Sequence, residues 1–120
     1  MNRTIDTDDI RHIFTFNTIS KYVEPKSICI IGDGKLNGVL SANLMFPKAK
    51  LYNVNLSEVL MHDLVILNKT NLKIKEEVNL VKKIDQEVNN KQLELIPSNF
   101  KNYLLTKKID LFVNIDTFQY

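Results

Sequence analysis

Residues 27–38 read Ser-Ile-Cys-Ile-Ile-Gly-Asp-Gly-Lys-Leu-Asn-Gly, and this stretch decides the fold. Its apolar run, residues 28–31, lacks polar alternation, which is typical of a parallel strand covered on both faces. Gly32 and Gly34 follow at once and permit backbone angles closed to other residues, so that main-chain N–H groups can approach a polar or anionic ligand. A helix over about 36–46 comes next. A strand, a glycine turn and a helix in this order predict a nucleotide-binding site.

The rest of the chain also alternates strands with helical segments. We expect a helix over 8–22 capped by Asp8 or Asp9 and ended by Pro25, strands over 51–56, 93–96 and 109–115, and helices over 57–68, 72–90 and 98–105. Ser57 and Ser98 suit helix N-caps, and the apolar positions expected to face inward include Ile10, Ile13, Phe14, Ile19, Tyr22, Leu36, Val39, Leu40, Leu44 and Met45. This alternation predicts an α/β fold, a Rossmann-like open parallel sheet of strand order 3-2-1-4 with flanking helices. The ligand is then expected beyond the carboxyl ends of strands one and four.

Length and composition bound the class of protein. The chain has 120 residues, 44% hydrophobic and 25% charged, which predicts one soluble domain over residues 1–120. No apolar stretch is long enough to cross a bilayer and the first residues lack a secretory signal, so we expect a cytoplasmic protein. The net charge of +2, with only two arginines, argues against a nucleic-acid partner. Cys29, the single cysteine, lies in the first strand and is expected to act as a small buried apolar group.

The glycine spacing narrows the kind of nucleotide. Gly32-x-Gly34-x-x-x-Gly38 is one residue longer than the dinucleotide fingerprint, and Asn55 ends the second strand where a dinucleotide site has an acidic residue. Glu58, three residues on, could substitute for that acid. The loop lacks the Gly-Lys-Ser/Thr ending of a P-loop. A tight strand-to-helix turn without any ligand is the alternative interpretation.

Three segments carry a resemblance to a known family. They are Ile-Cys-Ile-Ile-Gly-Asp-Gly at 28–34, Phe-Pro-Lys-Ala-Lys-Leu-Tyr-Asn-Val-Asn-Leu-Ser-Glu at 46–58, and Ile-Asp-Leu-Phe-Val-Asn-Ile-Asp-Thr-Phe-Gln at 109–119. Together they resemble the sugar O-methyltransferases, a family of S-adenosylmethionine-dependent, Rossmann-like enzymes. The resemblance covers most of residues 10–120 apart from the charged segment 70–92.

The resemblance implies a cofactor site as well as a fold. It implies that Gly32, Asp33 and Gly34 contact the amino-acid end of S-adenosylmethionine, that Asn55 holds the ribose, and that Asn114 and Ile115 on the fourth strand line the cofactor pocket. Ile30 and Asn55 stand where such enzymes often have acidic residues, which weakens the expected binding.

Methyl transfer to a hydroxyl also needs a base to take its proton. Asp116, at the end of the fourth strand, is the weak candidate. His12 and His62 are expected to be surface or packing residues on helices. Two distant histidines without grouped carboxylates predict no metal site.

The sequence thus favours a methyltransferase-like domain related to O-methylation of a sugar hydroxyl. A truncated or degenerate fold that serves as a non-catalytic interaction module is the alternative, and a dinucleotide-binding oxidoreductase is a distant third. A complete fold of the family adds three strands, so the chain is expected to hold the cofactor-binding half, truncated after the fourth strand. An apolar edge strand over 109–115 invites pairing with a second copy of the chain.

Overall fold

The computed structural model describes residues 15–32, 36–70, 73–82 and 91–114. These ranges hold five strands: β1 (Ser27–Ile31), β2 (Lys50–Asn55), β3 (Val78–Leu80), β4 (Leu93–Pro97) and β5 (Leu111–Asn114). Between the strands lie the α-helices α2 (Asn37–Met45) and α3 (Ser57–Asn68) and the 3-10 segments η1 (Lys73–Glu76) and η2 (Ser98–Thr106). Residues 15–20 are helical, within the predicted helix 8–22 whose first residues lie outside the described ranges.

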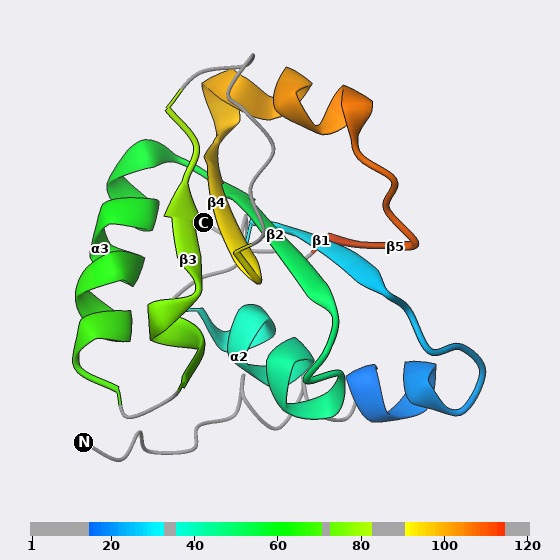
Figure 1. The fold of residues 1–120 in the computed structure, drawn as a ribbon. Coiled ribbons are helices and arrows are strands. Elements are labelled where there is room, and N and C mark those ends of the chain that lie inside the picture. The colour runs from blue at the N-terminus through cyan, green and yellow to red at the C-terminus, as the bar shows by residue number, and fades with distance from the viewer. Residues whose placement is uncertain (1–14, 33–35, 71–72, 83–90, 115–120) are drawn as a thin grey trace, which may run out of the picture.

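All five strands are parallel, in the order β3-β4-β2-β1-β5 (Figure 1). This confirms the predicted α/β fold with a parallel sheet flanked by helices. The predicted order 3-2-1-4 numbers the four expected strands along the chain. It is wrong because the sheet has a fifth strand, β3, at its edge beside β4. The four segments expected to be strands lie in the sheet as β4-β2-β1-β5. β1 lies between β2 and β5, and its first four residues are buried, which explains its unbroken apolar run.

Alternate residues of the strands enter two cores on opposite faces of the sheet. The main core, under α2, α3 and the helix of residues 15–20, contains Phe16, Ile28, Ile30, Leu36, Val39, Leu51, Leu60, Leu67, Leu93 and Leu95. The second core, under η2, contains Cys29, Tyr52, Val54, Val81, Ile96 and Tyr103. Figure 1 shows α3 beside β3, α2 crossing below the sheet, and η2 at the far end.

The helix predicted over 72–90 is wrong in its described part. Residues 73–76 form one 3-10 turn, and Val78–Leu80 form β3, which pairs in parallel with β4. The apolar residues at helical spacing misled the prediction, since Val78 and Leu80 instead alternate with Asn79 as strand residues and pack against the main core. Residues 83–90 lie outside the described ranges.

Two residues expected to face inward on the first two helices are exposed, whereas the others in the described ranges, Ile19, Leu36, Val39, Leu40 and Met45, lie in or against the main core as predicted. On α2, Leu44 is 67% exposed, because the buried face consists mainly of small residues, Gly38, Ser41 and Ala42. Small side chains let the helix lie close to β1 and β2. Tyr22, expected to face inward, is 82% exposed and lies beyond the end of the helix of residues 15–20.

The helix predicted over 57–68 is confirmed as α3, although Leu56 and not Ser57 occupies the N-cap position. The segment predicted as a helix over 98–105 is a 3-10 helix, η2, interrupted at Phe100 with φ −109° and ψ 20°. Its N-cap position is Pro97 and not Ser98. The last predicted strand, 109–115, begins later than expected, at Leu111.

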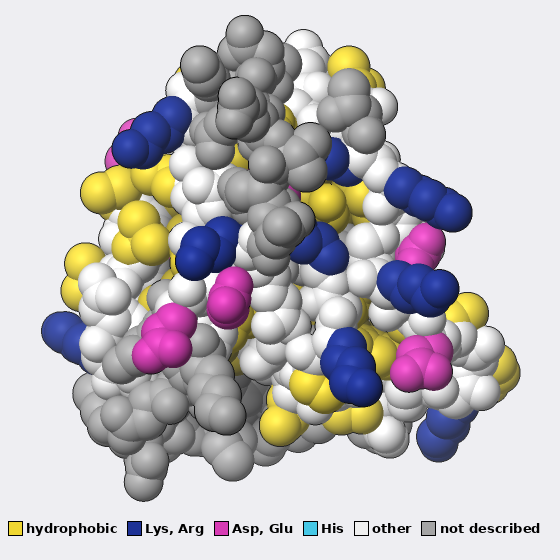
Figure 2. Space-filling view, in the orientation of Figure 1, with side chains coloured by type: hydrophobic (Ala, Val, Ile, Leu, Met, Phe, Trp, Pro, Cys, Tyr) yellow, Lys and Arg dark blue, Asp and Glu magenta, His cyan; other side chains and the backbone are white. Residues whose placement is uncertain are grey.

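No helix in the described ranges combines the length and apolar character needed to cross a bilayer. On the face drawn in Figure 2, basic and acidic side chains are interspersed and do not gather by sign. This mixture agrees with the small net charge of +2.

Candidate functional site

The strands of a parallel sheet all end at one edge, which we call the carboxyl edge. Ile31, the last residue of β1, is in register with Val54 on β2 and with Asn114 on β5. Gly32 and Asn55 each follow one of these registered positions on β1 and β2. The fold therefore brings Gly32, Asn55 and Asn114 to the ends of three adjacent strands, about 4.8 Å apart from strand to strand.

Gly32 has φ 78°, in the region that favours glycine, and it is buried. Its N–H donates a hydrogen bond of 3.0 Å to the carbonyl oxygen of Val54. The glycine thus ends β1 by continuing the ladder to β2, so this N–H group is engaged within the fold and does not face a ligand. The requirement for glycine here is one of backbone conformation.

A second residue with positive φ ends the turn. Leu36 has φ 62° and ψ 17° and occupies the N-cap position of α2 without a side-chain cap, while its side chain is fully buried in the main core. The burial of Leu36 stabilises a backbone conformation that leucine seldom adopts. Gly38 is buried on α2, where the absence of a side chain lets the helix pack close to the sheet.

Asn55 closes β2 and is half-buried. Its Oδ1 accepts a hydrogen bond of 2.9 Å from the N–H of Leu56, the residue at the N-cap of α3. The side chain predicted to hold a ribose therefore also supports the turn into α3. A neutral amide that shares its acceptor in this way binds a hydroxyl more weakly than a carboxylate would.

The other predicted site residues divide between exposed and undescribed positions. Asn114 is exposed at the end of β5. Asp33, Gly34, Ile115, Asp116 and His12 lie outside the described residues.

Two exposed apolar side chains at the carboxyl edge were missed by the sequence analysis. Ile31 is 37% exposed at the end of an otherwise buried strand, and Leu56 is 57% exposed at the start of α3. The signal was present in the sequence, since an apolar residue at the last position of a strand lies at the rim of the sheet. With Asn55 and Asn114, these side chains offer apolar contact and hydrogen-bonding groups at one edge.

Polar side chains buried in the main core were also missed. Asn37 is 3% exposed, and Asn53 and Asp63 are completely buried. Neither Oδ1 nor Nδ2 of Asn53 has a hydrogen-bond partner, and Asn37 Oδ1 has none. Such buried polar atoms are uncommon in native proteins and require a specific reason. Periodicity could not have found them, because it assigns polar residues to the surface.

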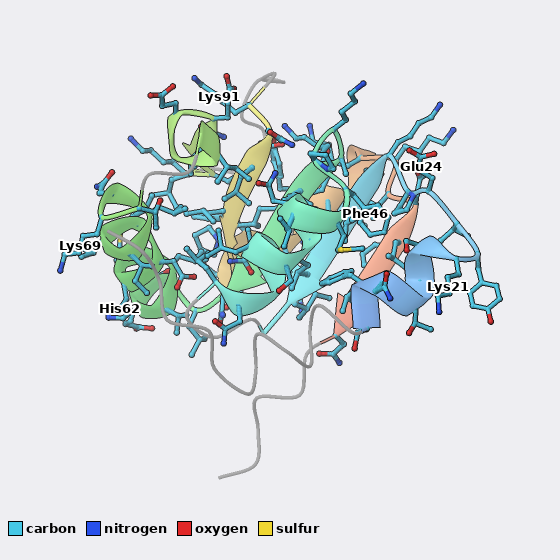
Figure 3. The ribbon with its side chains drawn as sticks, turned by 90° about the horizontal axis from the view of Figure 1, so that it is seen from below. Lys21, Glu24, Phe46, His62, Lys69 and Lys91 are labelled. Carbon is cyan, nitrogen blue, oxygen red and sulfur yellow. The ribbon has the colours of Figure 1, made fainter. Side chains whose placement is uncertain are left out.

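Three other residues, Cys29, His62 and Ile30, lie away from the carboxyl edge or are buried in the cores. Burial raises the pKa of the Cys29 thiol to about 12, so it stays protonated near neutral pH and packs as an apolar group. His62 is exposed on α3, directed away from the sheet (Figure 3). Ile30 is completely buried in the main core. The described residues contain no group of three or more potential metal ligands.

Comparison with known proteins gave no relative: no family model matches the chain, and no curated protein or solved structure matches it significantly. The carboxyl edge combines a glycine turn, two asparagines and two apolar side chains. They lie around the end of β1, which has β2 on one side and β5 on the other. In open α/β sheets, ligands bind where the winding direction reverses in this way.

Proposed function

We propose that the carboxyl edge around Gly32, Asn55 and Asn114 binds S-adenosylmethionine, and that the chain is a methyltransferase-like cofactor-binding domain. The observation that carries the proposal is the positive φ of Gly32 at the end of β1, the strand with β2 and β5 on either side. A glycine turn at this point of a doubly wound sheet is where nucleotide cofactors bind. The three resembling segments favour S-adenosylmethionine over a dinucleotide.

The available side chains suit such a cofactor. Ile31 and Leu56 offer apolar surface to a base, while Asn55 and Asn114 offer neutral hydrogen-bonding groups to a ribose. By resemblance, Asp33 and Gly34 extend the turn toward the amino-acid end, and Ile115 extends the pocket wall. Binding without a carboxylate at position 55 is expected to be weak.

For methyl transfer, the bound cofactor supplies a methyl group on a sulfonium. The chain's own task is to orient an acceptor hydroxyl in line and to hold a base that takes its proton. Asp116 is the residue we assign to that base. The assignment of a sugar hydroxyl as acceptor rests on the family resemblance alone.

Isothermal titration with S-adenosylmethionine and with its demethylated product tests the proposal. N55D should tighten binding about tenfold, because a carboxylate accepts hydrogen bonds from both ribose hydroxyls. The matched control is N68D, which adds the same charge at the exposed end of α3, thirteen residues after Asn55. Absence of binding at about 1 mM ligand, or an equal response of both variants, would overturn the proposal.

A non-catalytic binding module is the second candidate function. It is favoured by the hydrogen bonds that Gly32 N–H and Asn55 Oδ1 make within the fold, since both groups then serve the turn itself. Methyl transfer to a sugar by this chain would exclude it. Binding of a nicotinamide nucleotide in preference to the sulfonium cofactor would instead favour the oxidoreductase.

We also propose that β5 pairs with a second copy of the chain. Within the described ranges β5 pairs on one side only, with β1, and its Phe112 is 59% exposed. Unpaired backbone groups on an apolar edge favour association with another strand. Light scattering should give a dimer for the native chain and a monomer for F112K, which places a charge on this edge. A native monomer at about 100 μM would refute the pairing.

A further inference from the structure

A cavity of about 510 Å³ lies at the opposite edge of the sheet, where the strands begin. We call it the amino-edge cavity. It is formed where the chain enters β1, leaves α2 and enters β2, and its lining consists of Glu24, Pro25, Lys26, Met45, Phe46, Pro47, Lys48 and Ala49. Its volume lies within the range of small-molecule sites, about 300–1,000 Å³.

The walls of the cavity are held in place by hydrogen bonds. The N–H of Lys26 donates to an Asp110 carboxylate oxygen at 2.8 Å, which fixes the entry to β1. Gln92 Nε2 donates to the carbonyl oxygens of Pro47 at 2.6 Å and Ala49 at 3.1 Å, which fixes the turn before β2. Both walls are therefore organised before any ligand arrives.

The floor of the cavity is apolar. Phe46 is 6% exposed and packs edge-to-face on Phe16, with ring centroids 6.3 Å apart. Met45 beside it is half-buried. An aliphatic or aromatic group that enters the cavity would cover the exposed parts of Met45 and Pro47 from water.

Charges of both signs surround this floor. Glu24, Lys26 and Lys48 are exposed, and among the described residues none forms an ion pair with them. Helix α2 ends at Met45 with no basic residue in its last turn, so the partial negative charge of the helix end adds to that of Glu24. Figure 2 shows hydrophobic atoms beside basic and acidic side chains over this end of α2, and Figure 3 shows Glu24 and Phe46 on the same side of the molecule.

We propose that the amino-edge cavity binds a small zwitterion with an apolar group, of the class of free α-amino acids with large apolar side chains. Lys26 and Lys48 bind the carboxylate, Glu24 and the end of α2 bind the ammonium group, and the floor takes the side chain. A simple anion would be repelled by Glu24, and a simple cation would be repelled by Lys26 and Lys48. The site is independent of the proposed cofactor site at the other edge of the sheet.

Amide chemical shifts in ¹H–¹⁵N spectra of the full chain test the proposal, with L-phenylalanine as the probe. We expect saturable shifts confined to residues 24–26 and 45–49, with a dissociation constant of about 1 mM for a ligand of this size. Phenylacetate and 2-phenylethylamine, which each lack one charge, should bind about tenfold more weakly.

Substitutions at the rim separate the two charge contacts. K26Q/K48Q should weaken L-phenylalanine about tenfold but should not weaken 2-phenylethylamine, because its ammonium group is then no longer repelled by the lysines. E24Q should likewise weaken L-phenylalanine about tenfold and should not weaken phenylacetate. K69Q, at the exposed residue after α3, is the matched control and should change nothing. All four positions are exposed, so the fold is retained. Absence of localised shifts at about 20 mM, or equal binding of phenylacetate and L-phenylalanine, would overturn the proposal.

Discussion

The Tyr103 hydroxyl donates a hydrogen bond of 2.6 Å to Glu94 Oε1 on the sheet face covered by η2. The same carboxylate accepts a hydrogen bond of 3.3 Å from Asn79 Nδ2 and pairs with Lys50 Nζ at 3.0 Å. Elements β2, β3, β4 and η2 therefore meet at one carboxylate that is only 1% exposed. A buried carboxylate is stable only with such partners, so these contacts hold β3 and η2 against the sheet.

Removal of the carboxylate should be costly. E94A leaves Tyr103, Asn79 and Lys50 without their shared partner, and we expect the free energy of unfolding to fall by about 3 kcal/mol. This loss is at the lower end of the range expected when one partner of a buried ion pair is removed, because the Lys50 side chain is 23% exposed and can turn to water. Urea unfolding measures the change. E76A, at an exposed residue of η1, should stay within about 0.5 kcal/mol, and an E94A value as small as this would contradict the role of the cluster.

Loss of the Tyr103 hydroxyl should have a smaller effect that depends on pH. Y103F removes one hydrogen bond to a charged group, worth about 2 kcal/mol. Burial, together with the hydrogen bond to Glu94, raises the pKa of Tyr103. Since the unfolded side chain ionises near pH 10, the native protein should lose stability as pH rises above about 10. Y103F should show a shallower loss over that range in urea unfolding, and parallel curves would contradict this assignment.

The fold was predictable where a local pattern had one interpretation. The apolar run at 28–31 lacks polar alternation, which is typical of a strand covered on both faces, and it forms β1, an interior strand between β2 and β5. β3 was not predictable in this way, because Val78 and Val81 fit a helical period while the pairing with β4 that decides the structure is a long-range contact. The prediction that Leu44 faces inward was wrong for a related reason. Periodicity does not show that Gly38 and Ala42 allow α2 to approach the sheet more closely.

The sequence predicted the position of the candidate site in the sheet but not the hydrogen bonds that its residues make. The ends of β1, β2 and β5 follow from the alternation of strands and helices, so Gly32, Asn55 and Asn114 could be placed at one edge. That Gly32 N–H is engaged by Val54 could not be foreseen, because it depends on the register of β2. The amino-edge cavity was also missed, since its lining comes from the turns before β1 and β2, which only the folded sheet brings together.

Cys29 should be unreactive in the folded protein. Burial raises the pKa of its thiol from the ordinary 9.0 to about 12, so the unfolded thiol ionises first as pH rises. The stability that Cys29 contributes is therefore complete below about pH 9 and is lost between about pH 9 and pH 12. At about pH 8, a disulfide reagent should label the thiol only as fast as the protein opens.

Labelling in urea provides the control for Cys29, because the unfolded chain should react at the rate of a small thiol. C29A should remove part of the decline in stability above about pH 9. Rapid labelling of the native protein, at a rate that low concentrations of urea do not change, would contradict the burial of this side chain.

Replacement of the buried Asn53 should stabilise the protein. Asn53 lies fully buried on β2 with no hydrogen-bond partner for either amide atom. N53V removes this cost and introduces a residue that favours strands, so we expect a gain of about 1–2 kcal/mol in urea unfolding. N43V, at a half-buried position on α2, is the control and should give no gain. A loss in N53V would mean that water or a ligand satisfies the amide.

Substitutions at Gly32 should show whether this position requires glycine for its backbone conformation or because there is no room for a side chain. With φ 78°, alanine at this position should cost about 1–2 kcal/mol, because its Cβ disfavours the left-handed region. Asparagine tolerates that region better, so G32N should be less destabilised than G32A if conformation decides. If the buried site instead excludes any side chain, the larger asparagine should be the worse of the two. Urea unfolding of both variants without ligand separates these outcomes, and unchanged stability in both would contradict a structural requirement for glycine at the end of β1.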